Sequence, residues 1–431
     1  MTRAILAALT AATILTGCSR GGELAQEQVG PNPPLPEINQ YLLPPMRVAR
    51  PAPWGQAMPT VPQGMKVTAF ASGMKNVRSV YALPNGDVLA VEPKGPQEPV
   101  ARPKDILVNF IQGFGHSKVT GGNQITLLRD TDGDGRADVR TLFLDHLVSP
   151  FGVALVGNDL YVANTDAIVR YSYSPGQTRI TARGTILTEL PGGPIDHHWT
   201  KDLVASPDGS KLYVGIGSNS NITERGMEAE KDRARIWEVD RATGAHRAFA
   251  TGLRNPNGLR FEPTTSQLYA VINERDELGP DLVPDYLTSV RDGAFYGWPW
   301  SYWGRHVDPR VMPKRPDMVA RATVPDYGLG SHVAPLGMVF YQGASLPAAY
   351  RGGAFIGEHG SWDRGHFNGY KVVWVPFAGG RPSGKARDVV TGFLDGEGHA
   401  RGRPVGLAVD RAGGLLIADD LANVVWRVTG A

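Results

Sequence analysis

The chain has 431 residues, of which 44 are basic and 42 acidic, so its formal net charge at pH 7 is only +2. A charge this close to balance argues against a nucleic-acid-binding protein, which needs a marked excess of basic residues on one face. The chain has a single cysteine, so no disulfide bond can form within it. Its stability must therefore come from the burial of apolar side chains.

The first 18 residues have the pattern of an export signal. Arg3 precedes an apolar run over residues 4–14, which is too short to span a bilayer, and the run leads into Leu15-Thr16-Gly17-Cys18. This motif resembles the lipobox of bacterial lipoproteins, in which the cysteine is lipidated and becomes the first mature residue. The resemblance implies a lipid anchor on Cys18 at the periplasmic face of the cell envelope, and Ser19 in place of aspartate indicates the outer membrane. An ordinary cleaved signal is the alternative.

Residues 19–62 are rich in proline and show little apolar periodicity, which predicts an extended tether. Tyr41, Leu42, Leu43 and Trp54 are its candidates for docking onto the folded domain. No further apolar segment long enough to cross a membrane follows. Association with the membrane is therefore expected through the lipid anchor alone.

Residues 63–431 contain a repeated pattern of two short apolar strands joined by a turn of Gly, Asn, Asp or Pro. The pattern recurs six times, at residues 82–92, 154–164, 204–216, 260–272, 339–358 and 408–420. Six copies at uneven spacing, with no long amphipathic helix between them, predict an all-β fold: a six-bladed β-propeller with four-stranded antiparallel blades. A β-sandwich or two smaller β domains are the alternatives. In a propeller, loops far apart in sequence meet on one face.

The first candidate site is the loop before the hairpin at 204–216. It carries His198, flanked by His197 and Trp199 and preceded by Asp196. An imidazole on a loop held by a rigid sheet suits proton abstraction near neutral pH, with Asp196 or His197 expected to orient the ring. A structural or surface role of the His-His pair is the alternative.

Three further loops carry groups suited to an anion or a cation. Arg254 and Asn255 lie in the segment GLRNPNGL, where a proline-containing turn restricts the backbone. Arg401 and Arg403 precede the last hairpin, and two guanidinium groups one residue apart suit a polyanion. Residues 273–299 carry many carboxylates and carbonyls, which are the ligands of a hard cation.

Together, the His198 loop, GLRNPNGL, FYGWP at 295–299 and GRPVGLAVD near the end resemble the sorbosone dehydrogenase and soluble aldose (glucose) dehydrogenase family. The resemblance covers roughly residues 63 to 429. It implies a six-bladed propeller that binds pyrroloquinoline quinone and calcium on its face and oxidises sugars.

The resemblance also implies roles for single residues. His198 matches the base that takes the substrate hydroxyl proton, and Arg254 and Asn255 match the pair that contacts the quinone. Arg401 and Arg403 match the arginines that engage the cofactor carboxylates, and Arg364 is the nearest cation to a lysine that this chain lacks. The calcium site of the soluble members, a Gly-Pro element, is replaced here by Asn273-Glu274-Arg275-Asp276. Asn273 and Asp276 are therefore the expected metal residues.

A separate acidic segment at 130–138 follows the first half of an EF-hand loop, with Asp130, Asp132, Asp134 and Asp138 as candidate ligands and Gly135 at the sharp turn. Position twelve is Thr141 instead of glutamate. The flanking residues predict a hairpin instead of two helices. A plain acidic turn and a weak structural calcium site both remain open.

Two classes of function follow from these observations. The first is a quinoprotein oxidoreductase that oxidises a sugar or sugar aldehyde by hydride transfer to pyrroloquinoline quinone and passes electrons to an external acceptor, since the chain has no CxxCH haem-attachment motif. The second is a propeller that binds a ligand or partner without turnover. A metal-dependent propeller lactonase is a further alternative, but it has no use for the pair Arg401 and Arg403.

Overall fold

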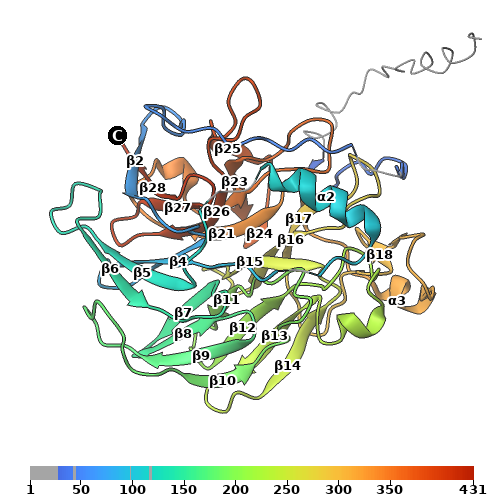
Figure 1. The fold of residues 1–431 in the computed structure, drawn as a ribbon, viewed down its shortest axis with the longest axis horizontal. Helices are drawn as coiled ribbons and strands as arrows, with labels where there is room; N and C mark the ends of the chain where they lie inside the picture. Colours follow the sequence, from blue (N-terminus) through green and yellow to red (C-terminus); the bar gives the residue numbers. More distant parts are fainter. Residues whose placement is uncertain (1–27, 42–44, 98, 116–118) are drawn as a thin grey trace, which may run out of the picture.

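The structure is a computed structural model that describes residues 28–41, 45–97, 99–115 and 119–431. Six antiparallel sheets of at least four strands follow one another around a ring (Figure 1). Each sheet is a blade whose strands run outward in chain order from the axis, except that β2 from the start of the domain is the outermost strand of the last blade. This confirms the all-β six-bladed propeller with four-stranded antiparallel blades.

Blades 1 to 3 follow one another in the first part of the chain. Blade 1 contains β3 (Ser79–Ala82), β4 (Val88–Glu92), β5 (Gln124–Arg129) and β6 (Val139–Leu144). Blade 2 contains β7 (Gly152–Val156), β8 (Asp159–Ala163), β9 (Ala167–Ser172) and β10 (Thr185–Glu189). Blade 3 contains β11 (Leu203–Ala205), β12 (Lys211–Ile216), β13 (Arg235–Asp240) and β14 (His246–Thr251).

Blades 4 to 6 complete the ring. Blade 4 contains β15 (Asn255–Phe261), β16 (Leu268–Asn273), β17 (Pro284–Ser289) and β20 (Tyr327–Ser331). Blade 5 contains β21 (Pro335–Tyr341), β22 (Gly353–Glu358), β23 (Lys371–Ala378) and β25 (Arg387–Val390), with β24 (Arg381–Pro382) added to β23. Blade 6 contains β26 (Pro404–Val409), β27 (Leu415–Asp419), β28 (Val424–Gly430) and β2 (Met65–Ser72). Short additions are β18 (Ser301–Tyr302), β19 (His306–Val307), α3 (Pro316–Arg321) and two 3-10 turns at Met227–Glu230 and Ala348–Tyr350.

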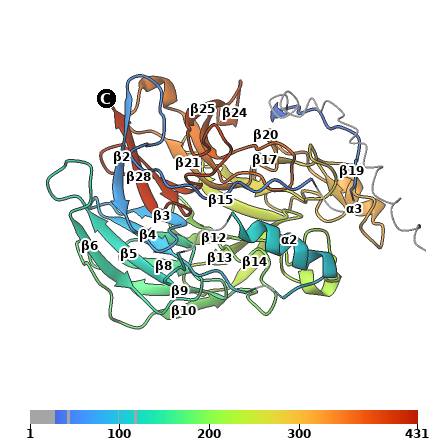
Figure 2. The same cartoon turned by 45° about the horizontal axis from the view of Figure 1, so that its top comes forward.

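The ring is closed in two ways. The first strands of consecutive blades contact one another in order, and the first strand of blade 6 contacts that of blade 1. In addition, β2 from the start of the domain pairs with β28 from its end, with Met65 opposite Gly430 (Figure 2). Pairing the two ends of the domain leaves no exposed inner edge, which is how a propeller protects its sheets from edge-to-edge association.

The six predicted hairpins are the first and second strands of the six blades. The second strand of each blade is largely buried because the blade packs between two others, and it is accordingly rich in apolar residues, as in LLIA of β27. In each blade the start of the first strand pairs with the end of the second, for example Asn255 with Asn273 and Pro404 with Asp419. The loops at these two points therefore lie on one face of the propeller.

The described part of the proline-rich segment, residues 28–41 and 45–62, is extended but lies against the propeller. β1 (Val29–Gly30) pairs with β20 as a fifth strand of blade 4. Trp54 packs edge-on against Phe393 and Trp426, with ring centroids 5.6 and 5.3 Å away. Trp54 therefore docks onto the folded domain, as expected for this extended segment, and its ring contacts help to offset the cost of ordering the chain. The signal sequence and Cys18, together with Leu42 and Leu43, lie outside the described residues.

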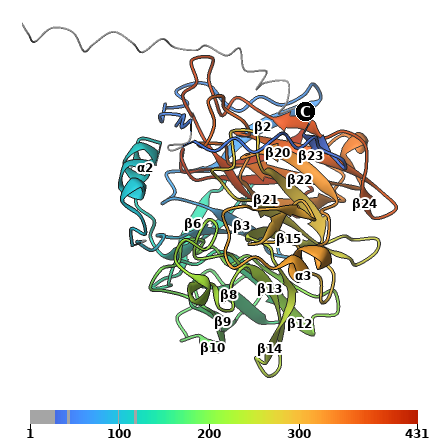
Figure 3. The same ribbon diagram turned by 90° about the vertical axis from the view of Figure 1, so that its right-hand side faces the viewer.

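An insertion between β4 and β5 forms an α-helix that the sequence pattern did not predict, α2 (Pro103–Gly113). Pro103 occupies the first helical position, and the Asp105 carboxylate accepts a hydrogen bond from the Arg102 backbone N–H at 2.8 Å. Figure 3 shows α2 standing out at the edge of the molecule. None of the helices in the described part of the chain has the length and apolar character needed to cross a bilayer.

Candidate active site

A cavity of about 430 Å³ lies on the propeller face where the loops of the blades converge. Five of the residues singled out from the sequence line it together: His198, Arg254, Asn255, Asn273 and Asp276. They come from blades 3 and 4, and α2 contributes further lining residues from the blade 1 insertion. The fold thus brings together groups that are up to about 80 residues apart in the sequence.

His198 is held in one tautomer. Its Nδ1 lies 2.9 Å from the carbonyl oxygen of Ser218 and 3.0 Å from the Ser218 Oγ. A carbonyl oxygen only accepts, so Nδ1 carries the hydrogen, and Nε2 is the ring nitrogen with a lone pair. Burial, together with the charges of His197, Arg254 and Arg233, lowers the pKa of His198 well below 6.5. The imidazole is therefore neutral at pH 7 and able to accept a proton at Nε2.

Asp196 holds the loop and not the ring. Its carboxylate accepts hydrogen bonds from the Thr165 hydroxyl at 2.8 Å and from the Arg233 guanidinium at 3.1 Å. Arg233 in turn donates to the His198 carbonyl oxygen at 3.0 Å. Asp196 has a φ of 51°, in the left-handed region that aspartate tolerates better than most residues. The expectation that Asp196 orients the imidazole is therefore wrong, since the Ser218 carbonyl does so.

Gly217 is required beside His198. A Cβ at this position would overlap the Cβ of His198 and would lie 2.7 Å from Oδ1 of Asn255. We expect Gly217→Ala to displace the catalytic imidazole, to lower turnover and to cost about 1–3 kcal/mol of unfolding free energy, the usual range for overpacking. Denaturant unfolding and steady-state kinetics measure both effects.

The matched control for this change is Gly396→Ala, because a Cβ there would meet no atom within 4 Å. Gly396→Ala is expected to leave both stability and turnover unchanged. If Gly217→Ala behaved like this control, the close packing of His198 against β12 and β15 would not hold the imidazole in place.

Arg254 is buried at the cavity wall and its guanidinium is fixed on several sides. It donates to the carbonyl oxygen of Glu274 at 2.6 Å and, more weakly, to that of Asn273 at 3.4 Å. It also pairs with the Asp276 carboxylate at 2.9 Å. Next to it, the Asn255 amide oxygen accepts a hydrogen bond from Asn257 at 3.2 Å. The result is a preorganised cation and an amide at the edge of the cavity.

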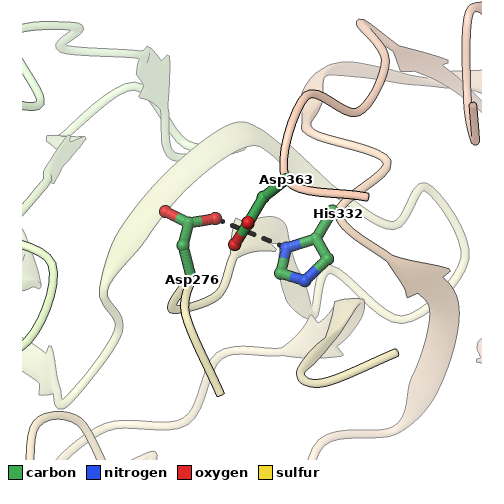
Figure 4. A group of neighbouring side chains, drawn as sticks. All are labelled: Asp276, His332 and Asp363. Atoms are coloured by element: carbon green, nitrogen blue, oxygen red, sulfur yellow. Dashed lines mark ion pairs between the residues drawn. The ribbon is translucent and has the colours of Figure 1, made fainter. Parts of the chain in front are cut away.

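Three ligand-type side chains lie together beside Arg254: Asp276, His332 and Asp363 (Figure 4). One oxygen or nitrogen from each lies within 4.8 Å of the others, and His332 Nδ1 is 3.4 Å from Asp276 Oδ1. Burial lowers the pKa of His332, but the hydrogen bond to Asp276 and the charge of Asp363 outweigh it and raise that pKa to about 9. Oδ1 of Asp363 is buried and accepts no hydrogen bond from the described residues.

Asp285 ties the loops of this group together. Its two carboxylate oxygens accept hydrogen bonds from the backbone N–H groups of Glu274, at 2.7 Å, and Ala334, at 2.8 Å. These residues lie close to Asp276 and His332 in sequence, so Asp285 sets the distance between the two side chains. Burial raises the pKa of Asp285 to about 7.

Asn273, expected as a metal residue, is not part of this group. Its side-chain amide donates to the Pro335 carbonyl oxygen at 2.7 Å. Its own carbonyl, like that of Glu274, already accepts hydrogen bonds from Arg254. The main-chain carbonyls at the position of the missing Gly-Pro element are thus occupied, and side chains are the groups that remain for a cation.

Arg403 lines a second cavity of about 510 Å³ that shares Arg78 with the first. The Nε atoms of Arg78 and Arg403 are buried and have no hydrogen-bond acceptor among the described residues. Arg401 lines neither of the two cavities. The structure therefore separates the two arginines that the sequence grouped as a pair.

Arg364, the expected substitute for a cofactor lysine, is a structural residue. It is buried, pairs with Asp281 at 2.7 Å and donates to the Ser331 carbonyl oxygen at 3.2 Å. It lines neither of the two cavities. The prediction that Arg364 contacts the cofactor is wrong in this arrangement, because Asp281 holds its guanidinium in the protein interior.

The acidic loop at 130–138 is a hairpin tip between β5 and β6, as predicted. Asp130, Asp132 and Asp138 each offer an oxygen within 4.8 Å of the others. Most of these oxygens already accept backbone hydrogen bonds, for example Asp130 from Gly133 and Gly135. Asp134 instead accepts from the Arg136 N–H at 2.7 Å. The loop is stable as a plain acidic turn, and both readings of it remain predictions.

Sequence reasoning missed Arg78, His332, Asp363 and helix α2 at this face. A usable signal existed for Arg78, because Arg78, Arg254 and Arg403 each stand directly before the first strand of a blade. Aligning the six repeats on those strands would have placed all three guanidinium groups on the same face. No comparable repeat position marks Asp363 or α2.

Comparison with known proteins agrees with this geometry. A family model described as Glucose / Sorbosone dehydrogenase matches residues 157–361, and one described as TrAA12-like matches residues 317–431. The Glucose / Sorbosone dehydrogenase match covers just under half of the chain. The matched residues include His198, Arg254, Asp276 and His332, which line the cavity.

The individual relatives of this chain are distant in sequence. An uncharacterised protein of Borreliella burgdorferi is 28% identical over 295 residues, which cover 65% of this chain and 76% of that protein. A pyrroloquinoline quinone-dependent pyranose dehydrogenase of Coprinopsis cinerea is 24% identical over 263 residues, which cover 51% of this chain but only 35% of that protein.

Solved structures share the fold. The holo form of the PQQ domain of the Coprinopsis cinerea pyranose dehydrogenase superposes with a TM-score of 0.68 at 20% identity, covering 89% of this chain and 100% of that one. The calcium structure of the Trichoderma reesei family AA12 enzyme gives a TM-score of 0.69 at 18% identity, covering 90% and 99%.

Proposed function

We propose that this chain is a dehydrogenase that uses pyrroloquinoline quinone to oxidise a hydroxyl of a sugar or of a hydrated sugar aldehyde. The observation that carries the proposal is His198, a neutral imidazole with Nδ1 bonded to Ser218 and Nε2 left as an acceptor. It lies in one cavity with the buried, fixed guanidinium of Arg254. A base and a fixed cation in one cavity are what alcohol oxidation requires.

The residues present fit the quinone. Its carboxylates need fixed cations, and the buried Nε atoms of Arg78 and Arg403 lack acceptors within the described chain. An oxyanion would satisfy both donors through charge-assisted hydrogen bonds. Arg254 and Asn255 would hold the other side of the group, in the cavity that also contains His198. When bound, the quinone supplies an acceptor for hydride.

Calcium is proposed as the accompanying cation, held by side chains. Asp276, His332 and Asp363 are the donor set, and Asp363 Oδ1 is an orphaned buried oxygen. A buried carboxylate oxygen without a partner favours a cation beside it. Carboxylates suit calcium, while the His332 imidazole suits softer divalent metals better. A bound cation would act as a Lewis acid next to the substrate.

The substrate hydroxyl would give its proton to Nε2 of His198. The Ser218 carbonyl keeps the ring in place during this transfer, and Arg233 fixes the main chain of the loop. Arg102, Asp105, Asn109 and Gln112 of the α2 segment line the opposite side of the cavity. Polar side chains at that position suit the several hydroxyls of a sugar, which supports a sugar or sugar aldehyde as substrate.

The decisive experiment is a visible absorption spectrum of the purified protein with pyrroloquinoline quinone and calcium, before and after addition of aldoses, alcohols and aldehydes. We expect a bound-quinone spectrum that changes when a substrate is added, followed by reduction of an external dye. Quinone binding without any change on addition of these compounds would favour the non-catalytic propeller. Hydrolysis of a lactone without quinone would favour the lactonase.

The dye replaces the natural electron acceptor in this assay. We propose that this acceptor is external, because the sequence contains no CxxCH haem-attachment motif. We propose that this acceptor takes electrons at the propeller face.

We also propose that the protein is anchored by lipid at the periplasmic face of the envelope, in the outer membrane, through Cys18. The motif Leu15-Thr16-Gly17-Cys18 supports this. We expect Cys18→Ala to lose acylation and to move the protein from the membrane fraction to the soluble fraction. Radiolabelled palmitate incorporation and cell fractionation measure this, and unchanged acylation in the variant would contradict the proposal.

A further inference from the structure

Helix α2 carries its polar side chains toward the protein and its apolar side chains toward solvent. Asp105, Asn109 and Gln112 line the active-site cavity, and Val108 is the buried residue of the helix. On the other side, four large apolar side chains are exposed. They are Ile106 (62% exposed), Leu107, Phe110 (65%) and Phe114.

These four side chains form one face, which we name the α2 apolar face. Their spacing of one, three and four residues is that of neighbours on a helix surface, and the rings of Phe110 and Phe114 pack edge-on with centroids 5.0 Å apart. A surface helix of a soluble protein normally turns such a stripe to the core. An exposed, contiguous apolar stripe indicates a surface that binds another protein or a membrane.

Positive charge flanks the α2 apolar face. The guanidinium of the exposed Arg50 lies 5.8 Å from the centre of the Phe114 ring. An apolar helical face beside exposed arginines is the arrangement of a helix that lies in the plane of a membrane surface with anionic lipids. Such a helix buries its apolar side chains at the acyl boundary while the arginines stay among the headgroups.

The start of the described chain and the start of α2 contact the same loop. Lys104 and Arg102 at the start of α2 pair with Glu277 at 2.6 and 3.3 Å. Four residues along that loop, the Asp281 carbonyl accepts a hydrogen bond from the Gln28 side chain at 2.6 Å. Ten residues separate Cys18 from Gln28, a reach of at most about 36 Å when fully extended. This reach allows a lipid on Cys18 and the α2 apolar face to meet the same bilayer.

We infer that α2 is an interfacial membrane helix whose apolar face, Ile106, Leu107, Phe110 and Phe114, docks into a lipid bilayer. The occupant is a membrane with anionic headgroups and not a protein, because the exposed Arg50 borders the face and the lipid anchor proposed at Cys18 can reach the same bilayer. The inference goes beyond the dehydrogenase activity and does not depend on it. It places the active-site cavity, which α2 lines from its polar side, next to the membrane surface.

The test uses the full chain with Cys18→Ser, so that no acyl group contributes to binding. We expect this protein to co-sediment with vesicles of phosphatidylethanolamine and phosphatidylglycerol, and less with vesicles of phosphatidylcholine alone. Adding Phe110→Ser and Phe114→Ser should lower the partition coefficient at least about tenfold, since each change removes a large apolar side chain from the interface. The matched control is Ile186→Ser on β10, an isoleucine that is 59% exposed in blade 2.

A second measurement reports the depth of the helix. Cys18 is the only cysteine, so Phe110→Cys in the Cys18→Ser background accepts one environment-sensitive fluorophore, and Ile186→Cys is its control. We expect the emission of the Phe110→Cys label, and not of the control, to shift to the blue with anionic vesicles. Equal vesicle binding by the Phe110→Ser, Phe114→Ser protein would overturn the inference. A concentration-dependent dimer in light scattering that this double variant abolishes would instead assign the face to a second copy.

Discussion

His198→Ala is expected to retain the quinone and to lose turnover by about 10² to 10⁴-fold, the usual contribution of a general base. The quinone is retained because the cations proposed to hold it, Arg78, Arg254 and Arg403, come from other loops. Turnover is lost because the substituted residue is the one whose Nε2 is proposed to accept the hydroxyl proton, with its Nδ1 bonded to the Ser218 carbonyl. Single-turnover spectroscopy with saturating sugar measures the chemical step apart from binding.

The pH profile tests the same base without a substitution. Burial, and then the nearby charges of His197, Arg254 and Arg233, keep the pKa of His198 well below 6.5. A base works in its neutral form, so kcat/KM should stay constant as pH falls through 6.5 and should decline only at lower pH, where His198 gains a proton. A decline centred at 6.5 or above would assign the profile to a different group.

The control for His198→Ala is His197→Ala, because the two rings are in contact, with centroids 4.4 Å apart, but only His198 is bonded to Ser218. His197→Ala is expected to cause a much smaller loss. If the two variants lost turnover equally, or if His198→Ala reacted as fast as the unchanged protein, His198 would not be the base. The pair of histidines would then be structural, which is the alternative that the sequence left open.

The fold could be predicted from the sequence because its information is local and repeated. Each hairpin is indicated by alternating apolar residues on both sides of a turn sequence. An example is β11 and β12 around the Pro207-Asp208-Gly209 turn. Six such hairpins specify six blades. The grouping of His198 with Arg254 and Asp276 then followed from the rule that propeller loops meet on one face, together with the family resemblance.

What could not be predicted depends on contacts between distant segments. Arg364 is a cation in a glycine-rich loop, and only the partner Asp281, 83 residues away, shows that it is an interior ion pair. The Asp363 carboxylate reaches Asp276 and His332 from another blade without any local motif. Helix α2 was missed because its apolar residues face solvent, so its pattern does not describe a helix packed on a core.

Arg403→Ala is expected to weaken quinone binding by roughly 10- to 100-fold, whereas Arg401→Ala should weaken it by less than about threefold. The family resemblance assigns both arginines to the cofactor, but the structure distinguishes them. Arg403 lines the cavity that shares Arg78 with the His198 cavity, and its buried Nε has no acceptor within the described chain. Arg401 lines neither cavity. Its charge adds to the hydrogen bond from the His399 N–H, the larger cause, in lowering the pKa of Asp395.

The two variants form a matched pair, since they remove the same side chain two residues apart in one loop. Equilibrium dialysis with pyrroloquinoline quinone, with and without calcium, gives both dissociation constants directly. Equal losses would show that the loop moves to bring both guanidinium groups to the quinone, as the family resemblance implies. If both variants bound the quinone with wild-type affinity, Arg403 would not contact the cofactor, and its unpaired Nε would no longer be evidence for a polyanionic ligand. In that case Arg254 would be the cation left to bind a ligand. A smaller ligand with less negative charge would then fit the cavity better.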